Sequence, residues 1–170
     1  NVVAADIVAT NGVIHVVNEV IDLPTIATFA TSNAALSILV DALAYADTGN
    51  PTVPYINTVS DATSGPFTVF APANDAFVAL LAELELDALT DLTPAQVDAV
   101  LLYHIVNANV QSSQLQSGTV GTLGGNITAD ATAFTLTDPN GRVSNIVTSL
   151  VDIQAANGVV HVIDKVILND

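Results

Sequence analysis

Three histidines are the residues of this chain best suited to acid–base or metal chemistry, because the sequence contains no cysteine. His15 and His161 occupy the same place in two related stretches, and His104 follows an apolar helical pattern. A histidine in such surroundings is more often a core residue, with its ring nitrogens bonded to backbone groups, than a metal ligand or a base. We therefore interpret His104 and His161 as structural residues of the core.

No other pattern in the sequence indicates catalysis or cofactor binding. No serine lies in a Gly-x-Ser-x-Gly turn, and the spacings typical of zinc proteases, phosphate-binding loops and calcium loops are absent. Glu83 and Glu85 are near neighbours at a predicted helix end, where carboxylates are more often solvated than catalytic. The sequence therefore predicts a protein that is not an enzyme and that holds no metal or other cofactor.

Net charge limits the partners of this chain. Seventeen acidic residues stand against Arg142 and Lys165, which gives a formal net charge of −15 at pH 7. Nucleic acid and anionic membranes would be repelled by such a surface, and no apolar run approaches the roughly 18–20 residues that span a bilayer. We expect no nucleic-acid partner and no membrane insertion. The acids are scattered, so they indicate a solubilising surface rather than a metal site.

The stretch from Asp152 to Leu168 has a second copy near the N-terminus. DIVATNGVIHVVNEVID, Asp6–Asp22, matches DIQAANGVVHVIDKVIL, Asp152–Leu168, at an offset of 146 positions. A repeat of this kind indicates that one structural unit recurs along the chain. We therefore predict that residues 1–23 are the closing strand segment of a preceding repeat and that residues 24–170 form one complete domain.

The repeated stretch is typical of a tight turn followed by a strand. Asn157-Gly158 favours the turn, and the β-branched residues after it suit a pleated sheet. Apolar residues occupy both faces, one formed by Val159, His161 and Ile163 and the other by Val160 and Val162. Because neither face is polar, we expect this strand to be central in its sheet rather than at an edge.

Helical patterns come first along the chain and strand patterns second. Helices are predicted after Pro24, after a cap at Ser32 or Asn33, after a cap at Asn74, and at 94–104 behind a Thr93 cap with Gln96 at its third position. Strands are predicted at 67–71, 105–110, 119–123, 127–131, 133–137 and 142–147. This order predicts an α+β fold with a mainly antiparallel sheet.

Glycines and prolines between residues 47 and 66 predict a loop of roughly 20 residues. Loops of this length are uncommon in compact domains and are often functional or mobile. Val53, Tyr55 and Ile56 either pin the loop to the core or present an apolar contact to a partner, and we favour pinning.

Three segments resemble the conserved boxes of the fasciclin domain family, in the same order. They are FTVFAPANDAF (Phe67–Phe77), LLYHIV (Leu101–Val106) and NGVVHVIDKVIL (Asn157–Leu168). The resemblance covers residues from about Pro24 to Leu168. It implies a compact α+β wedge with a β-sandwich core, secretion or cell-surface exposure, tandem repetition, and a role in adhesion or extracellular matrix without catalysis.

The resemblance also implies contact residues. In animal members of the family, integrin contacts lie at an Asp-Ile pair before the closing box and at the Tyr-His box with its branched aliphatic neighbours. The matching residues are Asp152 with Ile153, Asp6 with Ile7 in the partial copy, and Tyr103 with His104, Leu101, Leu102, Ile105 and Val106. Because His104, Leu101 and Ile105 have buried patterns, we expect Tyr103 and the two Asp-Ile pairs to make the contacts. The scarcity of lysine and the long predicted loop favour a microbial surface protein over an animal one.

Two functions are compatible with these patterns. The first is an adhesive or matrix-forming surface module, one repeat of a tandem array, that contacts surface or matrix proteins or further copies of itself. The alternative is an extracellular glycan-binding or small-ligand-binding module, for which Tyr45, Tyr55 and Tyr103 are the candidate stacking residues. Three placements are open for residues 6–22: against the following domain, paired with a neighbouring molecule, or within an upstream domain. We hypothesise that they pair as a strand outside the 24–170 core and form an assembly contact.

Overall fold

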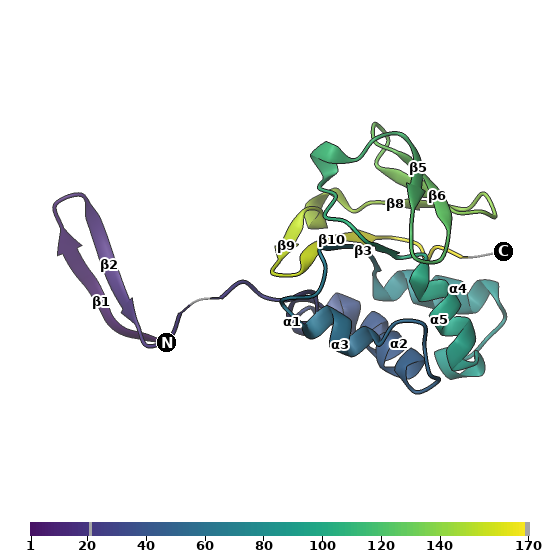
Figure 1. The fold of residues 1–170 in the computed structure, drawn as a ribbon, viewed down its shortest axis with the longest axis horizontal. Helices are drawn as coiled ribbons and strands as arrows, with labels where there is room; N and C mark the ends of the chain where they lie inside the picture. The colour runs from purple at the N-terminus through teal and green to yellow at the C-terminus, as the bar shows by residue number, and fades with distance from the viewer. Residues whose placement is uncertain (21, 169–170) are drawn as a thin grey trace.

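The computed structural model describes residues 1–20 and 22–168 and has two parts, an N-terminal hairpin and a three-layered body (Figure 1). In the body, helices cover one face of a central sheet and a second sheet covers the other face. The predicted α+β class is confirmed, since helices pack on the central sheet and most neighbouring strands in the two sheets of the body are antiparallel.

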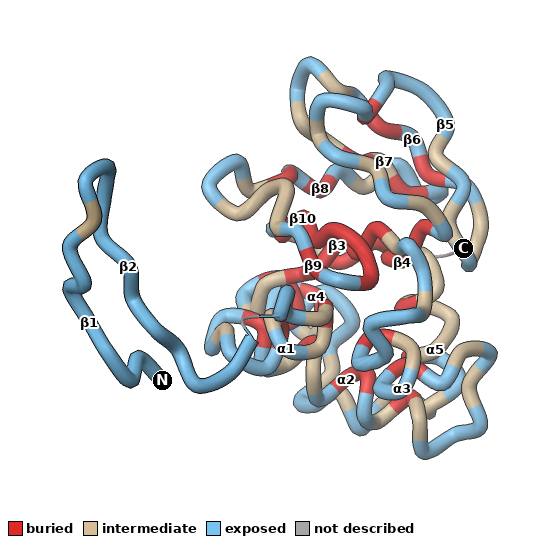
Figure 2. Tube along the Cα trace, turned by 60° about the vertical axis from the view of Figure 1, so that its left-hand side comes forward, coloured by how far each residue is buried: buried red, intermediate tan, exposed pale blue. Residues whose placement is uncertain are grey.

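The hairpin consists of β1 (Val2–Ala9) and β2 (Gly12–Val17), which pair antiparallel around a turn at Thr10 and Asn11. It projects away from the body, and nearly every residue in it is exposed (Figure 2). The predicted strand outside the 24–170 core is therefore present, and its pairing partner is the segment directly before it. Ile21 of the repeated stretch Asp6–Asp22 lies outside the described residues.

The central sheet has the strand order β4-β3-β10-β9. The strands are β3 (Phe67–Pro72), β4 (Ile105–Val106), β9 (Ile153–Ala155) and β10 (Gly158–Ile163). The predicted central strand is confirmed, because β10 pairs parallel with β3 on one side and antiparallel with β9 on the other.

The second sheet is a four-stranded antiparallel meander. Its strands are β5 (Gly118–Gly121), β6 (Asn126–Asp130), β7 (Thr135–Thr137) and β8 (Val143–Asn145), and each overlaps a predicted strand. A bridge between Ile146 and Ile163 joins the two sheets. Between them lies a core that includes Phe70, Leu136 and Ile163.

The helices form the opposite layer. They are α1 (Ile26–Ser32), α2 (Ser37–Asp47), α3 (Tyr55–Ser60), α4 (Asn74–Glu83) and α5 (Pro94–Leu102), with short 3₁₀ turns at Ala34–Leu36, Leu89–Asp91, Ser112–Gln114 and Thr148–Leu150. Val160 and Val162 of β10 face this layer and share its core, whereas Ile163 faces the second sheet. The two predicted faces of the strand are thus both buried.

The predicted loop at residues 47–66 is wrong in part, because α3 forms within it. Tyr55, the first residue of that helix, is fully buried, and its hydroxyl donates to Asp98 Oδ1 at 2.6 Å. The side chain of Asp47 accepts from the amides of Tyr55 and Ile56. The segment is therefore pinned to the core, as we favoured, although Ile56 remains exposed.

Of the three predicted caps, two form: Asn33 caps the 3₁₀ turn Ala34–Leu36 that leads into α2, accepting from the amide of Ala35 at 3.1 Å, and Thr93 caps α5. Thr93 and Gln96 form a capping box with Pro94 at the first helical position, as predicted. Asn74 does not cap α4, because it is the first residue of that helix and not the residue before it. Its side-chain oxygen instead accepts from the amide of Ile38 at 3.0 Å, at the start of α2, so the asparagine ties two helices together.

Candidate contact site

The hairpin β1–β2 has the same local structure as β9–β10. Ile7 pairs with Ile14 and Ala9 with Gly12, just as Ile153 pairs with Val160 and Ala155 with Gly158. The preceding aspartate has the left-handed backbone conformation in both copies, with φ of 57° at Asp6 and 56° at Asp152.

The same side-chain hydrogen bond closes both copies. The amide of Asp6 donates to His15 Nδ1 at 3.2 Å, and the amide of Asp152 donates to His161 Nδ1, also at 3.2 Å. Sequence reasoning recognised the repeated strand but missed β1, although the repeated Asp-Ile pair was a signal for it. The two stretches thus form one structural element present twice.

In the body, the side chains of Asp152, Asn157 and His161 in this element are hydrogen-bonded to neighbouring segments. Asn157 accepts from the amide of Ile26 at 3.0 Å, at the start of α1, and donates to the carbonyls of Thr58 and Val59. His161 donates through Nε2 to the carbonyl of Val110 at 2.8 Å and stacks on Phe70. Asn157 is 1% exposed to solvent. The sequence predicted Asn157 as a turn residue but not as a buried side chain that links separate segments.

In the hairpin, the equivalent side chains are exposed to solvent. Nine of the fifteen exposed large hydrophobic residues in the described part of the chain lie in its first 20 residues, and they are Val2, Val3, Ile7, Val8, Val13, Ile14, Val16, Val17 and Val20. The edge of β2 that corresponds to the β3-paired edge of β10 is also without a strand neighbour in the two-stranded sheet. Apolar surface concentrated in one place is typical of a contact site.

The candidate contact pair Asp152 and Ile153 is only half-exposed. The Asp152 carboxylate accepts from the Ser112 amide at 2.6 Å and from the Ser112 hydroxyl. Burial raises the pKa of this carboxyl, but the Ser112 hydrogen bonds and the nearby His161 outweigh it, so its pKa lies below the usual value. The equivalent Asp6 and Ile7 are exposed, which makes them the more accessible of the two pairs.

Tyr103, the third candidate contact residue, is half-buried and packs against the core between the sheets. Its ring lies against Gly124 and Gly125, so closely that a Cβ atom added at Gly124 would meet the ring at 2.4 Å. Part of the ring is therefore occupied by contacts within the domain. Tyr45 is half-buried as well and Tyr55 is fully buried, so none of the three tyrosines presents an open ring to a sugar.

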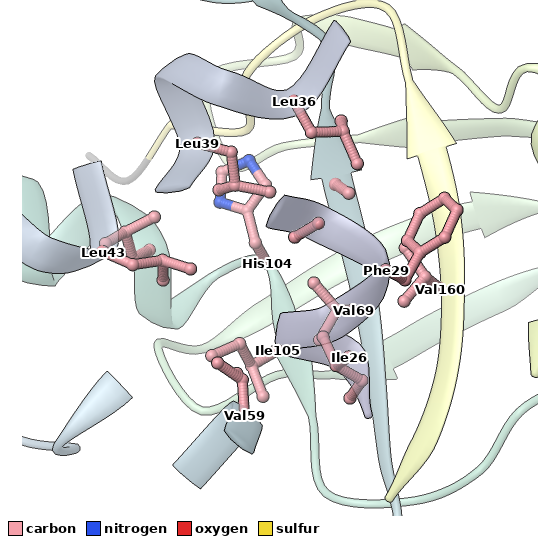
Figure 3. A pocket seen from close by; sticks show the side chains of 13 residues that line it. Ile26, Phe29, Leu36, Leu39, Leu43, Val59, Val69, His104, Ile105 and Val160 are labelled. Carbon is pink, nitrogen blue, oxygen red and sulfur yellow. The ribbon is translucent and has the colours of Figure 1, made fainter. Parts of the chain in front are cut away.

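His104 lies at the edge of a small apolar cavity between α1, α2 and the central sheet (Figure 3). The cavity has a volume of about 20 Å³, too small for any ligand larger than water. His104 is 2% exposed, donates through Nδ1 to Val100, and accepts from the amide of Ile167 at 3.0 Å. Burial lowers its pKa to about 4. Both ring nitrogens are engaged, which leaves neither free to act as a base.

The two basic side chains of the chain lie together. Arg142 and Lys165 both contact Glu83, and Arg142 also lies 3.6 Å from the buried carboxylate of Asp138. The other carboxylates of the described residues have no basic side chain within ion-pair distance. Within residues 1–20 and 22–168, no group of three or more His, Asp or Glu side chains is placed to bind a metal ion.

The helices can be compared with the length and apolarity that a membrane span requires. Among the helices that the structure describes, none alone is long and apolar enough to cross a bilayer. Residues 26–32 and 34–47 reach the required length and apolarity only as a pair bent by 104°.

A two-sheet body capped by helices, closed by an Asn-Gly-Val-x-His-Val strand, defines a fasciclin domain. The fasciclin domain model matches residues 34–169, and the chain belongs to this family. A solved structure described as a FAS1 domain pair from the insect cell adhesion molecule Fasciclin I matches with a TM-score of 0.65 at 17% identity, over 99% of this chain and 59% of that chain.

Relatives of this chain occur in bacteria and in animals. Protein sll1483 of Synechocystis sp. is 38% identical over 144 residues, which are 85% of this chain and 73% of that protein. Cell surface glycolipoprotein MPB83 of Mycobacterium bovis is 31% identical over 84% of this chain and 60% of its own length. Transforming growth factor-beta-induced protein ig-h3 of Sus scrofa is 37% identical over 105 residues, and the match spans 15% of that protein.

Proposed function

We propose that this chain is a non-catalytic extracellular or cell-surface module of a microbial protein, which acts in adhesion or in a surface matrix by direct contact. The family assignment supports this function, together with relatives that are by name a cell-surface glycolipoprotein and a cell adhesion molecule. The engagement of both buried histidines by backbone groups argues against an alternative as an enzyme.

The observation that carries the proposal is the uncovered apolar hairpin. It has the structure of a closing element, yet it lies outside the body, whose own closing element is β9–β10. We assign residues 1–23 to the closing segment of a preceding repeat and residues 24–170 to one complete domain. The partners are further copies of such domains or surface and matrix proteins, and Asp6, Ile7 and the exposed part of Tyr103 are the contact residues.

Light scattering on the 1–170 chain and on a 24–170 chain tests the role of the hairpin. Both core clusters lie within residues 26–168, so the shorter chain retains its core. We expect concentration-dependent association of the longer chain and a monomer for the shorter one. Two monomers of equal stability would contradict an assembly role.

Adhesion itself is tested with beads that carry the protein on their surface. We expect beads coated with the 1–170 chain to cluster, and beads coated with an Ile7→Asp, Ile14→Asp variant to remain dispersed, because charges on the hairpin oppose burial of its apolar surface. A matched variant with Val78→Asp changes an exposed residue of α4 and should cluster normally. Equal clustering of all three would place the contact elsewhere.

A further inference from the structure

We propose that the hairpin β1–β2 of one molecule can occupy the place of β9–β10 in a second copy of this chain, once β9–β10 of that copy has been released. We call this place the closing slot, and it is bounded by β3, the carbonyl of Val110, Ser112 and the first turn of α1. The inference goes beyond the proposed function, because it names the surface into which the hairpin fits.

The backbone of the hairpin matches the slot. In β10, residues Gly158–Ile163 pair parallel with Phe67–Pro72, residue by residue. Gly12–Ile14 of β2 pair with Ile7–Ala9 in the same register as Gly158–Val160 pair with Ile153–Ala155, around the same turn. The free edge of β2 therefore presents its backbone donors and acceptors there at the same spacing. The parallel edge of β3 is thus complementary to either strand.

The polar side chains of the hairpin also match. Asn11 corresponds to Asn157, which holds the first amide of α1, and His15 corresponds to His161, which donates to Val110. His15 already accepts from the amide of Asp6 through Nδ1, so its other nitrogen is the donor that the Val110 carbonyl requires. The backbone groups that Asn157 and His161 satisfy in the body would therefore keep partners after the exchange.

The apolar side chains fill nearly the same volume in both elements. Ile14 replaces Val160 and adds one methylene, while Val17 replaces Ile163 and removes one. Val13 and Val16 are identical to their counterparts. The remaining differences in the paired strands, Val8 for Gln154 and Thr10 for Ala156 in the turn, fall at positions that are exposed in the body. Volume-conserving exchanges of this kind are the ones that cores tolerate best.

The sequence repeat pairs residues 18–22 with residues 164–168, and once these residues also take their counterparts' places, the hairpin can reach only the slot of another molecule. The counterpart of Asp22 is Leu168, whose amide donates to Asp138 beyond the far end of β10. Pro24 lies at the opposite end, where its carbonyl accepts from the amide of Ala156 at 2.8 Å. Leu23 alone would have to bridge this separation, and two Cα steps of about 3.8 Å cannot span a six-residue strand of roughly 16 Å.

Two sequence differences between the two hairpins favour β9–β10 over β1–β2 in the closing slot. Lys165 lies 3.9 Å from Glu83. The counterpart of Lys165 in the N-terminal copy is Glu19, so insertion would bring the negative charges of Glu19 and Glu83 together. Asp164 accepts from the amide and side chain of Asn145, and its counterpart is Asn18. Because β9–β10 is also tethered to its slot, exchange requires that this hairpin be weakened. Insertion into successive copies then gives a head-to-tail chain that does not close.

A variant with Val160→Asp and Val162→Asp tests the proposal on the full chain. Both valines are buried against the helical layer, so the changes disable β10 and leave β2 intact. We expect native circular dichroism only at concentrations where light scattering shows oligomers, because each molecule then holds one competent hairpin and one vacant slot. Glu19→Lys added to this variant should lower the concentration at which half of the protein is assembled.

The matched control adds Ile14→Asp and Val16→Asp, which disable β2 at the equivalent positions. This chain should be unfolded and unassembled at every concentration. The proposal is overturned if the Val160→Asp, Val162→Asp variant is unfolded at all concentrations, or if it is a folded monomer. The bead experiment uses an intact β9–β10, so a failure of adhesion there is distinguishable from a failure here.

Discussion

The side chain of Asn157 and the backbone amide of Ile26 are joined by a buried hydrogen bond of 3.0 Å across 131 positions of sequence. The turn before the last strand therefore holds the first turn of the first helix of the body. Because the same asparagine also donates to Thr58 and Val59, it links α1, α3 and the closing strand. This one side chain thus contributes to the position of three elements.

Asn157→Ala should reduce the free energy of unfolding by about 2–4 kcal/mol, because the Ile26 amide and two carbonyls lose their partner in a buried place. Urea denaturation measures the change. Asn11→Ala alters the exposed counterpart and should change the free energy of unfolding by no more than about 0.5 kcal/mol. Equal effects in the two variants would show that the hydrogen bonds of Asn157 contribute little.

Replacement of either buried histidine should also destabilise the body. His104→Ala and His161→Ala each leave a cavity and an unpaired backbone group, at a cost of roughly 2–4 kcal/mol. Thermal denaturation reports the loss as a lower Tm. His15→Ala is the matched control for His161→Ala, and it should leave the Tm of the body unchanged. An unchanged Tm in both buried variants would contradict the core role of these residues.

The buried neutral state of His104 predicts a pH dependence of stability. Its pKa in the folded protein is about 4, against an ordinary value of 6.5, so the unfolded chain binds a proton first as the pH falls. The stabilising contribution is complete above pH 6.5, declines as the pH falls below this value, and levels off near pH 4. The shift corresponds to about 3 kcal/mol.

Comparison with a His104→Gln variant isolates this contribution from that of the carboxylates, which titrate in both proteins. We expect the difference in unfolding free energy between wild type and variant to be largest at pH 7.5 and to shrink at pH 4. A difference that stays constant over this range would show that His104 is protonated equally in the folded and unfolded states.

Gly124→Ala should destabilise the domain by about 1–3 kcal/mol, because the added methyl group overlaps the ring and the backbone of Tyr103. Tyr103→Ala combined with Gly124→Ala removes the ring overlap, so the double variant should lose less stability than the sum of the two single variants. Additive losses would place the ring of Tyr103 away from Gly124 in solution. Denaturation of all three variants measures the coupling.

Patterns of neighbouring residues predicted those elements that are determined by residues close together in the sequence. Thr93, Pro94 and Gln96 lie within four residues and form the capping box that they indicate. The central position of β10 was predictable because Val160 and Ile163 point to opposite faces and are both apolar. The family resemblance added the two-sheet arrangement, which periodicity alone does not determine.

Other features depend on residues distant in sequence and could not be predicted. Asn74 serves the amide of Ile38, which is 36 positions earlier, instead of its own helix. Helix α3 has only six residues, so the spacing of its apolar residues is too short to reveal a helical periodicity. It also begins directly after Pro54, in a segment rich in turn signals. The extension of β1 to Val2 had no signal, because residues 2–5 do not match the residues before Asp152.

The placement of Pro24 and Leu168 at opposite ends of β10 has a mechanical consequence. Tension applied between these two points acts along the strand, so β10 is loaded in shear against the parallel strand β3. The hydrogen bonds from Gly158 to Ile163 then share the load and fail together, instead of being peeled apart one by one. We expect such a module to resist stretching up to a threshold force, at which β10 detaches and exposes the edge of β3.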